Sequence, residues 1–455
     1  MTLFNKRVAV LGMAKSGIAV GNAVKQLGGE ATVFDQKPAD NPAIIEAVDE
    51  LHSAEVCAVP GWHGRLDPDE FDMLVVSPGF PSDHPAIRDM SARDVFGEVE
   101  FAYRIAHDPI VAITGTNGKS TTTVLTWRLL EAAGKKALLC GNIAGSGYHE
   151  MTLTEAALEG GDVLVAEVSS FQLELIDQFR PFVAAITNVS PDHLDRHKSF
   201  DEYRDCKLRI FANMRDADII VFNSDEQSMT KEMLPEDSRK VRFSPKGHGS
   251  TTGFTARLQD DLFLSGHQVG VKKLPLMGEH NVANAMMAWE IACAILGEPT
   301  EPQTDAMLSA LLTFKGLANR MERVAERDGL IVVNNSMCTN PAAVVASSQG
   351  INMRQHLLLG GHRKSIDFAP VGEYLQGTDH AAYLFGPDTE GLNGQMGSDW
   401  PTYSSMEDAF AAATENAKEG EVVILMPGCL SAEPFENFRE RGDAFRELAK
   451  RWEEQ

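Results

Sequence analysis

Short apolar runs alternate with longer stretches of helical hydrophobic spacing along almost the whole chain. Near the N-terminus, the run "RVAVLG" is followed by the helical pattern "MAKSGIAVGNAVKQLG" and then by the runs "EATVFD" and "DMLVVSPG". A second series starts with "IVAITG" and a third with "LIVVNNS". This alternation predicts strand–helix–strand units, and therefore parallel sheets with helices on their faces. The predicted fold class is α/β.

Two breaks in this pattern predict three open α/β domains. The stretch "AYRIAHDP" indicates a helix that ends before Pro109, and "GEPTEPQT" begins a connection before the third series. We place the domains at residues 1–107, 108–314 and 315–455. Within the second domain, glycine-rich alternation between about residues 240 and 276 predicts a small antiparallel patch.

Composition and charge argue against several classes of partner. Of the 455 residues, 43% are hydrophobic and 23% are charged, which is typical of globular proteins, but the formal net charge is -24. Nucleic acid and membrane surfaces are therefore not expected partners, because both are polyanionic. The six cysteines form no C-x-x-C pair, no apolar run reaches the roughly 18 residues that span a bilayer, and no signal-peptide pattern is present. A reduced, cytoplasmic protein is expected.

The stretch "AITGTNGKSTTTVL", residues 112–125, is a shortened phosphate-binding loop. The usual G-x-x-x-x-G-K-[ST] spacing would place a glycine at position 113, where the chain has isoleucine. Backbone N–H groups at a helix N-terminus still bind phosphate wherever the first glycine lies. The loop residues expected at the phosphates are Gly115, Thr116, Asn117, Gly118 and Lys119, with Ser120 or Thr121 offering a hydroxyl to Mg²⁺.

The first strand is followed by "GMAKSG", residues 12–17, which departs from the dinucleotide fingerprint G-x-G-x-x-G at Ala14. Asp35 stands at the right distance for that fingerprint, but Ala14 makes close approach of a pyrophosphate, and so NAD binding, unfavourable. Lys15 and Lys37 could instead neutralise a nucleotide-sugar diphosphate. The alternative is a plain strand–helix turn.

Acidic and imidazole side chains follow two later strands. Glu167 ends "DVLVAE", and Asp192 and His193 follow "ITNVSP". Because ligands of open α/β sheets bind where strands end, these residues are candidate Mg²⁺ ligands, although one such residue alone is more often a helix cap. Lys207 in "YRDCKLRIF" is by default a surface or ion-paired lysine.

A series of motifs extends over nearly the whole chain: "TGTNGKSTTT", "GN" at Asn142, "EVSSFQLE", "TNVSPDHLDRH", "CKLRI", "GEHNVANAMMA", "GLANRME" and "GGHRKSIDF". This series resembles the Mur ligases, in which the shortened loop is the normal form. The resemblance implies a Rossmann-like UDP-sugar domain, a P-loop ATPase-like central domain and a Rossmann-like amino-acid domain. It also implies ATP-dependent addition of glutamate, with the D-enantiomer expected, to UDP-N-acetylmuramoyl-L-alanine. The reaction would pass through an acyl phosphate and release ADP and phosphate in peptidoglycan synthesis.

The resemblance carries site residues over by matching position. The expected ATP contacts are Gly115, Thr116, Asn117, Gly118, Lys119, Ser120, Thr121, Asn281, Asn284 and Arg320. The expected UDP-sugar contacts are Lys15, Ser16, Asp35, Gln36, Lys37, Ser77, Pro78, Gly79, Asn142, Ser169 and Gln172. The expected amino-acid contacts are Thr339, Lys364, Ser431 and Phe438. The expected catalytic residues are Lys119, Glu167, His193 and Lys207, and the expected Mg²⁺ ligands are Ser120, Glu167, His193 and Lys207. Lys207 matches a lysine that is carbamylated in the family.

The chain departs from the family pattern in the third domain. An Asp-Ser-Lys-Ala-Thr motif is here "NSMCT", residues 335–339, and a Gly-Leu-Pro-His-Arg segment is "GLANR", residues 316–320. Asn335 and Met337 thus replace a carboxylate and an ammonium. Two alternatives stay open: a diverged ligase that uses L-glutamate or another amino acid, and a catalytically weakened nucleotide-sugar-binding regulator. The expected partners are small molecules only, and the chain is expected to be a monomer.

Overall fold

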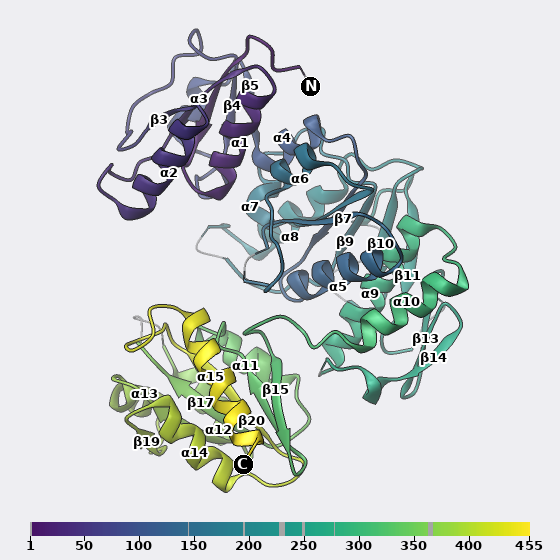
Figure 1. Cartoon of the computed structure of the whole chain (residues 1–455), viewed down its shortest axis with the longest axis vertical. Helices are drawn as coiled ribbons and strands as arrows, with labels where there is room; N and C mark the ends of the chain where they lie inside the picture. The colour runs from purple at the N-terminus through teal and green to yellow at the C-terminus, as the bar shows by residue number, and fades with distance from the viewer. Residues whose placement is uncertain are drawn as a thin grey trace. The chain divides into compact units, whose positions relative to one another are not determined.

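The computed structural model describes residues 2–143, 145–193, 196–226, 233–247, 251–276, 278–362 and 367–455 (Figure 1). The chain forms two compact units. The first comprises Met1–Ala144, His149–Lys273 and Ala283–Leu312, and the second comprises Gly145–Tyr148, Leu274–Val282 and Thr313–Gln455. Every helix in these described ranges is too short or too polar to cross a membrane.

The N-terminal part of the first unit is a five-stranded parallel sheet in the order β3-β2-β1-β4-β5. Alternate residues of its central strands fill two cores, one on each face: Val8 and Val10 point to one, Ala9 and Leu11 to the other. Burial on both faces explains why these strands are apolar throughout. The elements are β1 (Arg7–Leu11), α1 (Lys15–Gln26), β2 (Glu30–Phe34), α2 (Pro42–Ser53), β3 (Cys57–Val59), β4 (Met73–Val76), α3 (Pro85–Asp89), β5 (Asp94–Gly97) and α4 (Glu98–Ile105).

A six-stranded parallel sheet follows in the order β11-β10-β9-β6-β8-β7. Its parallel strands bring the loops after β6, β7, β8 and β9 to one edge, where ligands of such sheets bind. The elements are β6 (Ile110–Thr114), α5 (Lys119–Ala132), β7 (Ala137–Gly141), α6 (Leu153–Glu159), β8 (Val163–Glu167), α7 (Ser170–Leu173), β9 (Val183–Ile186), α8 (Phe200–Leu208), β10 (Ile219–Asn223) and β11 (Arg239–Phe243).

The predicted antiparallel patch is present as three short strands. They are β12 (Thr255–Leu258), β13 (Asp261–Leu264) and β14 (His267–Gly270). They are followed by α9 (Glu279–Leu296) and α10 (Glu301–Leu312). Glu290 of α9 is buried and accepts hydrogen bonds from the backbone N–H groups of residues 254 and 255, at 2.8 and 2.7 Å. This buried carboxylate joins the patch to α9.

The first two sheets share one continuous core. Phe101 and Ala102 of α4 belong to the same cluster of buried residues as Val10 of the first sheet and Leu153 and Ala156 of α6. The predicted boundary near residue 107 therefore lies inside one compact unit, although each side of it has its own sheet. The exact domain limits stay a prediction.

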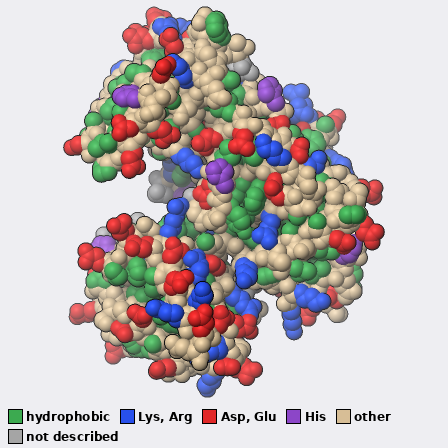
Figure 2. Space-filling view, in the orientation of Figure 1, with side chains coloured by type: hydrophobic (Ala, Val, Ile, Leu, Met, Phe, Trp, Pro, Cys, Tyr) green, Lys and Arg blue, Asp and Glu red, His purple; other side chains and the backbone are tan. Residues whose placement is uncertain are grey.

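The second unit holds a six-stranded sheet in the order β15-β16-β20-β17-β18-β19. All neighbours are parallel except β15 and β16, which form an antiparallel hairpin at one edge. Apolar clusters cover both faces. The elements are β15 (Glu322–Arg327), β16 (Leu330–Asn334), α11 (Pro341–Gln349), β17 (Gln355–Gly360), α12 (Ala369–Gln376), β18 (Ala381–Phe385), α13 (Thr389–Met396), β19 (Thr402–Tyr403), α14 (Met406–Asn416), β20 (Val422–Gly428) and α15 (Phe438–Glu453). Acidic and basic side chains are mixed over the face of the protein shown in Figure 2.

A buried carboxylate in α4 links the two sheets of the first unit. Glu100 is fully buried, accepts from the backbone N–H groups of residues 177–179 at 2.8 to 3.1 Å, and pairs with Arg104 Nε at 2.7 Å. We expect Glu100→Ala to lower the free energy of unfolding by about 3 kcal/mol, because it leaves buried donors without an acceptor. Denaturant unfolding measures this.

The exposed ion pair of Glu159 with Lys136, at 3.5 Å, provides the control. Glu159→Ala should change the stability by less than about 1 kcal/mol. Equal stability losses for the two variants would show that Glu100 is no more than a surface charge.

Candidate active site

The phosphate loop lies between β6 and α5, as the sequence predicts. Gly118 precedes α5 with φ of 80°, and the start of the helix has no side-chain cap among the described residues. The N-cap residue, a glycine, therefore offers no side-chain oxygen of its own to the first turn of α5. The backbone N–H groups of that turn carry partial positive charge and form a binding site for a phosphate oxygen.

Residues that follow β9 hold the loop in shape. Thr187 Oγ1 donates to the carbonyl oxygen of Asn117 at 2.6 Å, and Asn188 Nδ2 donates to the same oxygen at 2.9 Å. Asn188 Oδ1 accepts from the Asn117 N–H at 3.0 Å. Sequence reasoning missed Thr187 and Asn188 as site residues, although both lie in the motif "TNVSP".

Lys207 is not a surface lysine. Its side chain is 2% exposed, its ammonium donates to the carbonyl oxygen of Gly115 at 2.8 Å, and it lies 4.5 Å from the centre of the Tyr203 ring. Burial, followed by the charge of Lys119, lowers the pKa of Lys207 to about 7. The default expectation of an exposed or ion-paired lysine is therefore wrong.

Three further side chains act on Lys207, and two of them are carboxylates. Cys206, Asp192 and Glu167 each oppose the lowering of its pKa. The phosphate loop, the end of β8 and the segment after β9 thus place their charged residues around one amine. This grouping was predicted for strand ends, and the structure brings the residues together.

Glu167 ends β8 and carries an unpaired buried oxygen. Its side chain is 3% exposed; Oε1 accepts from Asn142 Nδ2 at 3.2 Å, while Oε2 has no hydrogen-bond partner among the described residues. A buried carboxylate oxygen without a partner is costly, and a cation would satisfy it. This is the observation in the central sheet that fits a metal ligand most directly.

His193 follows Asp192 at the same edge of the sheet. It has φ of 52°, a strained value for a residue other than glycine, and its ring lies 5.0 Å from that of Phe171. The described side chains include no group of three His, Cys, Asp or Glu placed to hold a metal ion. A metal ion here would need other ligands, such as the hydroxyl of Ser120, which is buried at the start of α5.

Three of the predicted ATP contacts, Asn281, Asn284 and Arg320, are divided between the two units. Asn284 belongs to the first unit, where its Oδ1 accepts from Thr122 Oγ1 of α5 at 3.2 Å. Asn281 and Arg320 belong to the second unit. Asn281 is buried, and Arg320 Nη2 lies 3.0 Å from the sulfur of Met337. The structure therefore places Asn284 beside the phosphate loop and leaves the roles of the other two as predictions.

The predicted nucleotide-sugar residues of the first sheet follow β1, β2 and β4. Asp35 is buried, and its two oxygens accept from the backbone N–H groups of Met13 and Lys37, at 2.8 and 2.9 Å. Asp35 thus shapes the loop after β1. The other members of this predicted set lie at the start of α1 and in the loops after β2 and β4; they are Lys15, Ser16, Gln36, Lys37, Ser77, Pro78 and Gly79.

The other predicted UDP-sugar contacts, Asn142, Ser169 and Gln172, lie beside the central sheet. Asn142 follows β7 and its backbone N–H donates to the Glu167 carbonyl at 2.8 Å. Ser169 and Gln172 form a capping box at α7: Ser169 Oγ accepts from the Gln172 N–H at 3.3 Å, and Gln172 Oε1 accepts from the Ser169 N–H at 2.9 Å. Each of the two residues therefore has a structural role of its own.

The residues predicted to contact the amino-acid substrate lie at the carboxyl edge of the six-stranded sheet of the second unit, called the third sheet below. Ser431 follows β20, and its hydroxyl oxygen is buried without a hydrogen-bond partner among the described residues. Thr339 is half-buried, and Phe438 begins α15. Lys364 lies outside the described residues. The unpaired Ser431 hydroxyl marks this edge as a place where a ligand could bind.

Arg441 organises the same edge and was missed from the sequence. It is 0% exposed; Nε donates to Ser336 Oγ at 3.0 Å, and Nη2 donates to the carbonyl oxygens of Ser336 and Cys429 at 2.9 and 3.4 Å. Burial lowers the pKa of Arg441 to about 10. The buried guanidinium thus joins α15 to the segments that carry Thr339 and Ser431.

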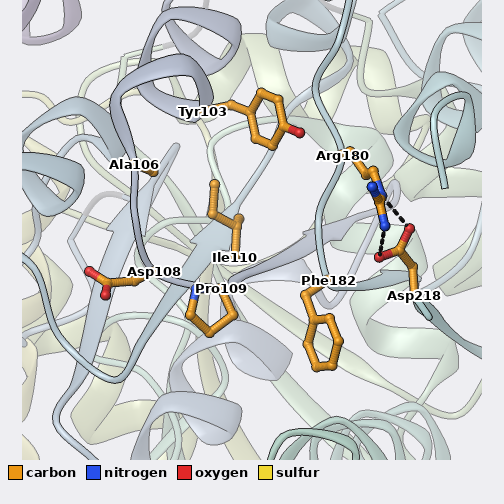
Figure 3. A pocket seen from close by; sticks show the side chains of 8 residues that line it. All are labelled: Tyr103, Ala106, Asp108, Pro109, Ile110, Arg180, Phe182 and Asp218. Atoms are coloured by element: carbon orange, nitrogen blue, oxygen red, sulfur yellow. Dashed lines mark hydrogen bonds and ion pairs between the residues drawn. The ribbon is translucent and has the colours of Figure 1, made fainter. Parts of the chain in front are cut away.

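Among the described residues, one cavity lies away from this edge, and another is lined in part by Arg441. The first, of about 130 Å³, lies at the amino end of β6 and β9, where Arg180 pairs with Asp218 at 2.6 and 3.2 Å (Figure 3). This end of the sheet is opposite the phosphate loop, and the pair satisfies both charges. The other, of about 300 Å³, lies in the second unit among Phe385, Met406 and Phe435, close to Ser431 in sequence.

Comparison with known proteins identifies the family. Residues 113–292 match the Mur ligase middle domain, and residues 319–429 match the Mur ligase glutamate ligase domain. A relative from Thermoanaerobacter pseudethanolicus, named UDP-N-acetylmuramoylalanine--D-glutamate ligase, is 34% identical over 98% of both chains. A relative of the same name from Koribacter versatilis is 32% identical over 100% of this chain and 99% of its own. The chain is a Mur ligase.

Solved structures agree with this assignment at the level of fold. The MurF ligase from Thermotoga maritima in complex with ADP aligns with a TM-score of 0.57 and 15% identity, over 100% of this chain and 99% of its own. MurF from Acinetobacter baumannii aligns with a TM-score of 0.59 and 16% identity, over 97% and 93% of the two chains. The expected three-domain α/β fold of this Mur ligase is confirmed.

Gly118 offers a direct test of the phosphate loop in this Mur ligase. A Cβ at Gly118 would lie 2.5 Å from Asn284 Oδ1, so Gly118→Ala must displace either the loop or Asn284. We expect its affinity for ADP, measured by calorimetry, to fall at least tenfold.

Gly134, just beyond α5, is the matched control. Its φ is 85°, close to that of Gly118, but a Cβ there would meet no atom within 4 Å. Gly134→Ala should carry the backbone strain of about 1 kcal/mol and keep the wild-type affinity for ADP. If both variants bound ADP like the wild type, the loop would not be the nucleotide site.

Proposed function

We propose that this Mur ligase uses ATP to join D-glutamate to UDP-N-acetylmuramoyl-L-alanine, and releases ADP and phosphate. The reaction belongs to the synthesis of peptidoglycan precursors, and so to cell-wall formation, cell shape and division. The name shared by relatives that match this chain over nearly its full length supports this choice of substrates. The unpaired buried oxygen of Glu167 beside the phosphate-loop charges carries the proposal, since a binding protein has no need of it.

The chemistry follows from the poor reactivity of a carboxylate, which has no leaving group. Transfer of the ATP γ-phosphoryl group to the alanyl carboxylate gives an acyl phosphate, and phosphate then leaves when the glutamate amine attacks. Lys119 and the first turn of α5 would neutralise the phosphates during transfer. In the proposal, the predicted ATP contacts bind the phosphates and the rest of the nucleotide. The predicted UDP-sugar contacts of the first sheet bind the uridine diphosphate.

Mg²⁺ is the proposed cofactor, and it would polarise the transferred phosphoryl group. Glu167 fits as a ligand because its Oε2 is buried and has no hydrogen-bond partner among the residues that the structure describes. His193 and Ser120 are the other proposed ligands. Lys207 as an ammonium cannot bind a cation, but its carbamate can. Reaction with CO₂ needs the neutral amine, which a pKa of about 7 makes abundant near neutral pH.

The third sheet supplies the proposed glutamate site. Ser431 offers a buried hydroxyl that has no hydrogen-bond partner in the described part of the chain, and Arg441 fixes the segment that carries it. Thr339, Phe438 and Lys364 complete the proposed set. The enzyme would act as a monomer in the cytoplasm, where its nucleotide substrates are made.

The amino-acid preference can be tested by phosphate release. The purified enzyme is mixed with ATP, Mg²⁺, UDP-N-acetylmuramoyl-L-alanine and, in turn, D-glutamate, L-glutamate or another amino acid. Among the amino acids, we expect only D-glutamate to give phosphate release. Lys119→Ala, which lacks the loop cation, should release no phosphate with any of them. Release with L-glutamate instead would support the diverged ligase. Binding of UDP-sugar without any release would support the weakened regulator.

Lys207→Ala should lose most of the activity, and acetate added in solution should restore part of it by replacing the carbamate. Lys207→Arg is the control: it keeps a cation near Gly115 but cannot form a carbamate and leaves no room for acetate, so it should stay inactive. In the wild type at limiting CO₂, activity should rise as the pH rises through about 7, because the neutral amine then increases. Full activity of Lys207→Ala without acetate would contradict the carbamate.

Met337→Lys should raise kcat only slightly or reduce it. The Met337 sulfur lies 3.0 Å from Arg320 Nη2, so a lysine there would place two cations side by side. Asn335 Oδ1 accepts from the Met321 N–H at 3.2 Å, and Asn335→Asp keeps this acceptor while adding a negative charge. The double variant should therefore be tolerated better than Met337→Lys alone.

Met337→Leu, which adds no charge, is the control for loss of the sulfur. Steady-state kinetics with varied glutamate would measure kcat and KM for each variant. A large gain in kcat from Met337→Lys alone would mean that the site has decayed and that the two replacements do not compensate each other.

A further inference from the structure

An amide and an imidazole meet at the carboxyl edge of the first sheet. Gln36 follows β2 and is exposed, whereas His84 precedes α3 and is half-buried. Gln36 Nε2 and His84 Nε2 are 3.2 Å apart. Whether the ring nitrogen of His84 carries a hydrogen decides which atom of the pair donates, and therefore which group of Gln36 faces a ligand.

The second contact of His84 settles the position of its proton. His84 Nδ1 accepts from the Ala86 N–H at 3.3 Å and so caps α3. An Nδ1 that accepts a hydrogen bond carries no proton, so the ring is neutral in this arrangement. Burial acts in the same direction by lowering the pKa of His84, although Asp83 and Asp89 oppose the shift. A neutral imidazole that accepts at Nδ1 carries its proton on Nε2. His84 Nε2 is therefore a donor toward Gln36.

Two donors cannot form a hydrogen bond, so the amide of Gln36 must turn its oxygen to the ring. A half-turn of the amide leaves its shape unchanged and exchanges Nε2 for Oε1. Both His84 contacts are then satisfied. The opposite choice, with the proton of the ring on Nδ1, would set a second donor against the Ala86 N–H. The Gln36 amino group, which has no other partner among the described residues, is then available to a ligand.

Aromatic rings pack around His84 and hold its ring in place. The ring centres of Trp62 and Phe80 lie 6.3 and 5.2 Å from that of His84, and Trp62 also packs on Phe34 at 5.0 Å. Both oxygens of Asp35 are used by backbone N–H groups. Gln36 is thus the exposed hydrogen-bonding side chain that directly follows β2.

We propose that His84 positions Gln36 to donate a hydrogen bond to the base of the nucleotide-sugar substrate, and that this pair selects uracil over cytosine. Uracil has a carbonyl acceptor at C4, where cytosine has an amino donor. The inference rests on the proposed function, which places a uridine diphosphate at this edge.

Calorimetric titration of the full chain with UDP and with CDP tests the proposal. The wild type should bind UDP more tightly. Gln36→Glu keeps the side-chain length and the bond from His84 but presents an acceptor to the base. Its ratio of UDP affinity to CDP affinity should therefore fall tenfold or more. Gln26→Glu, at the exposed end of α1, adds the same charge and should keep the wild-type ratio.

His84→Asn separates positioning from folding. Asparagine can cap α3 as His84 does, but it is too short to hold Gln36. The protein should keep its Tm while its preference for UDP shrinks, because the freed amide can present either end. An unchanged UDP-to-CDP ratio in Gln36→Glu would overturn the pair alone. A wild type that binds neither nucleotide would overturn the nucleotide-sugar site itself, and the inference with it.

Discussion

Three consecutive carbonyl groups of the phosphate loop accept hydrogen bonds from side chains, and the active site depends on this. Lys207 donates to the carbonyl of Gly115, Lys119 to that of Thr116, and Thr187 and Asn188 to that of Asn117. A bare carbonyl oxygen near a phosphate would repel it. Because donors engage these oxygens, the positive end of α5 can face an anion without a competing row of negative dipoles. The loop can therefore present N–H groups to a phosphate, because its neighbours hold its acceptors.

The same arrangement makes one lysine serve two purposes. Lys207 donates a hydrogen bond to the loop. Its burial, followed by the charge of Lys119, lowers the pKa of its amine to about 7. Glu167, held by Asn142, is the complementary group: an acid whose free oxygen is buried. A bound cation would satisfy the acid and draw the amine into the negatively charged form that CO₂ provides. Under the proposed function, loop geometry and metal binding would therefore be coupled through Lys207.

Much of this could be predicted from local sequence, and the reasons for the rest are physical. Hydrophobic period and strand ends predict the α/β fold, the phosphate loop and Glu167, because these depend on residues close in sequence. The burial of Lys207 depends on packing between α8 and the loop, which no local pattern records. Asn188 and Arg441 act on backbone groups 71 and 105 residues away in sequence. Ser431 could be predicted by family resemblance, but its unpaired hydroxyl required the folded structure.

The continuous core beneath the first two sheets limits how the chain can be divided. Phe101 and Ala102 are fully buried, and they pack in one cluster with residues of both sheets. A fragment that ended near residue 107 would expose this apolar face to water and would be prone to aggregate. The part built on the first sheet and the part that carries the phosphate loop thus form one compact unit with a shared core. Evolution could not exchange either part for that of another protein without rebuilding the surface between them.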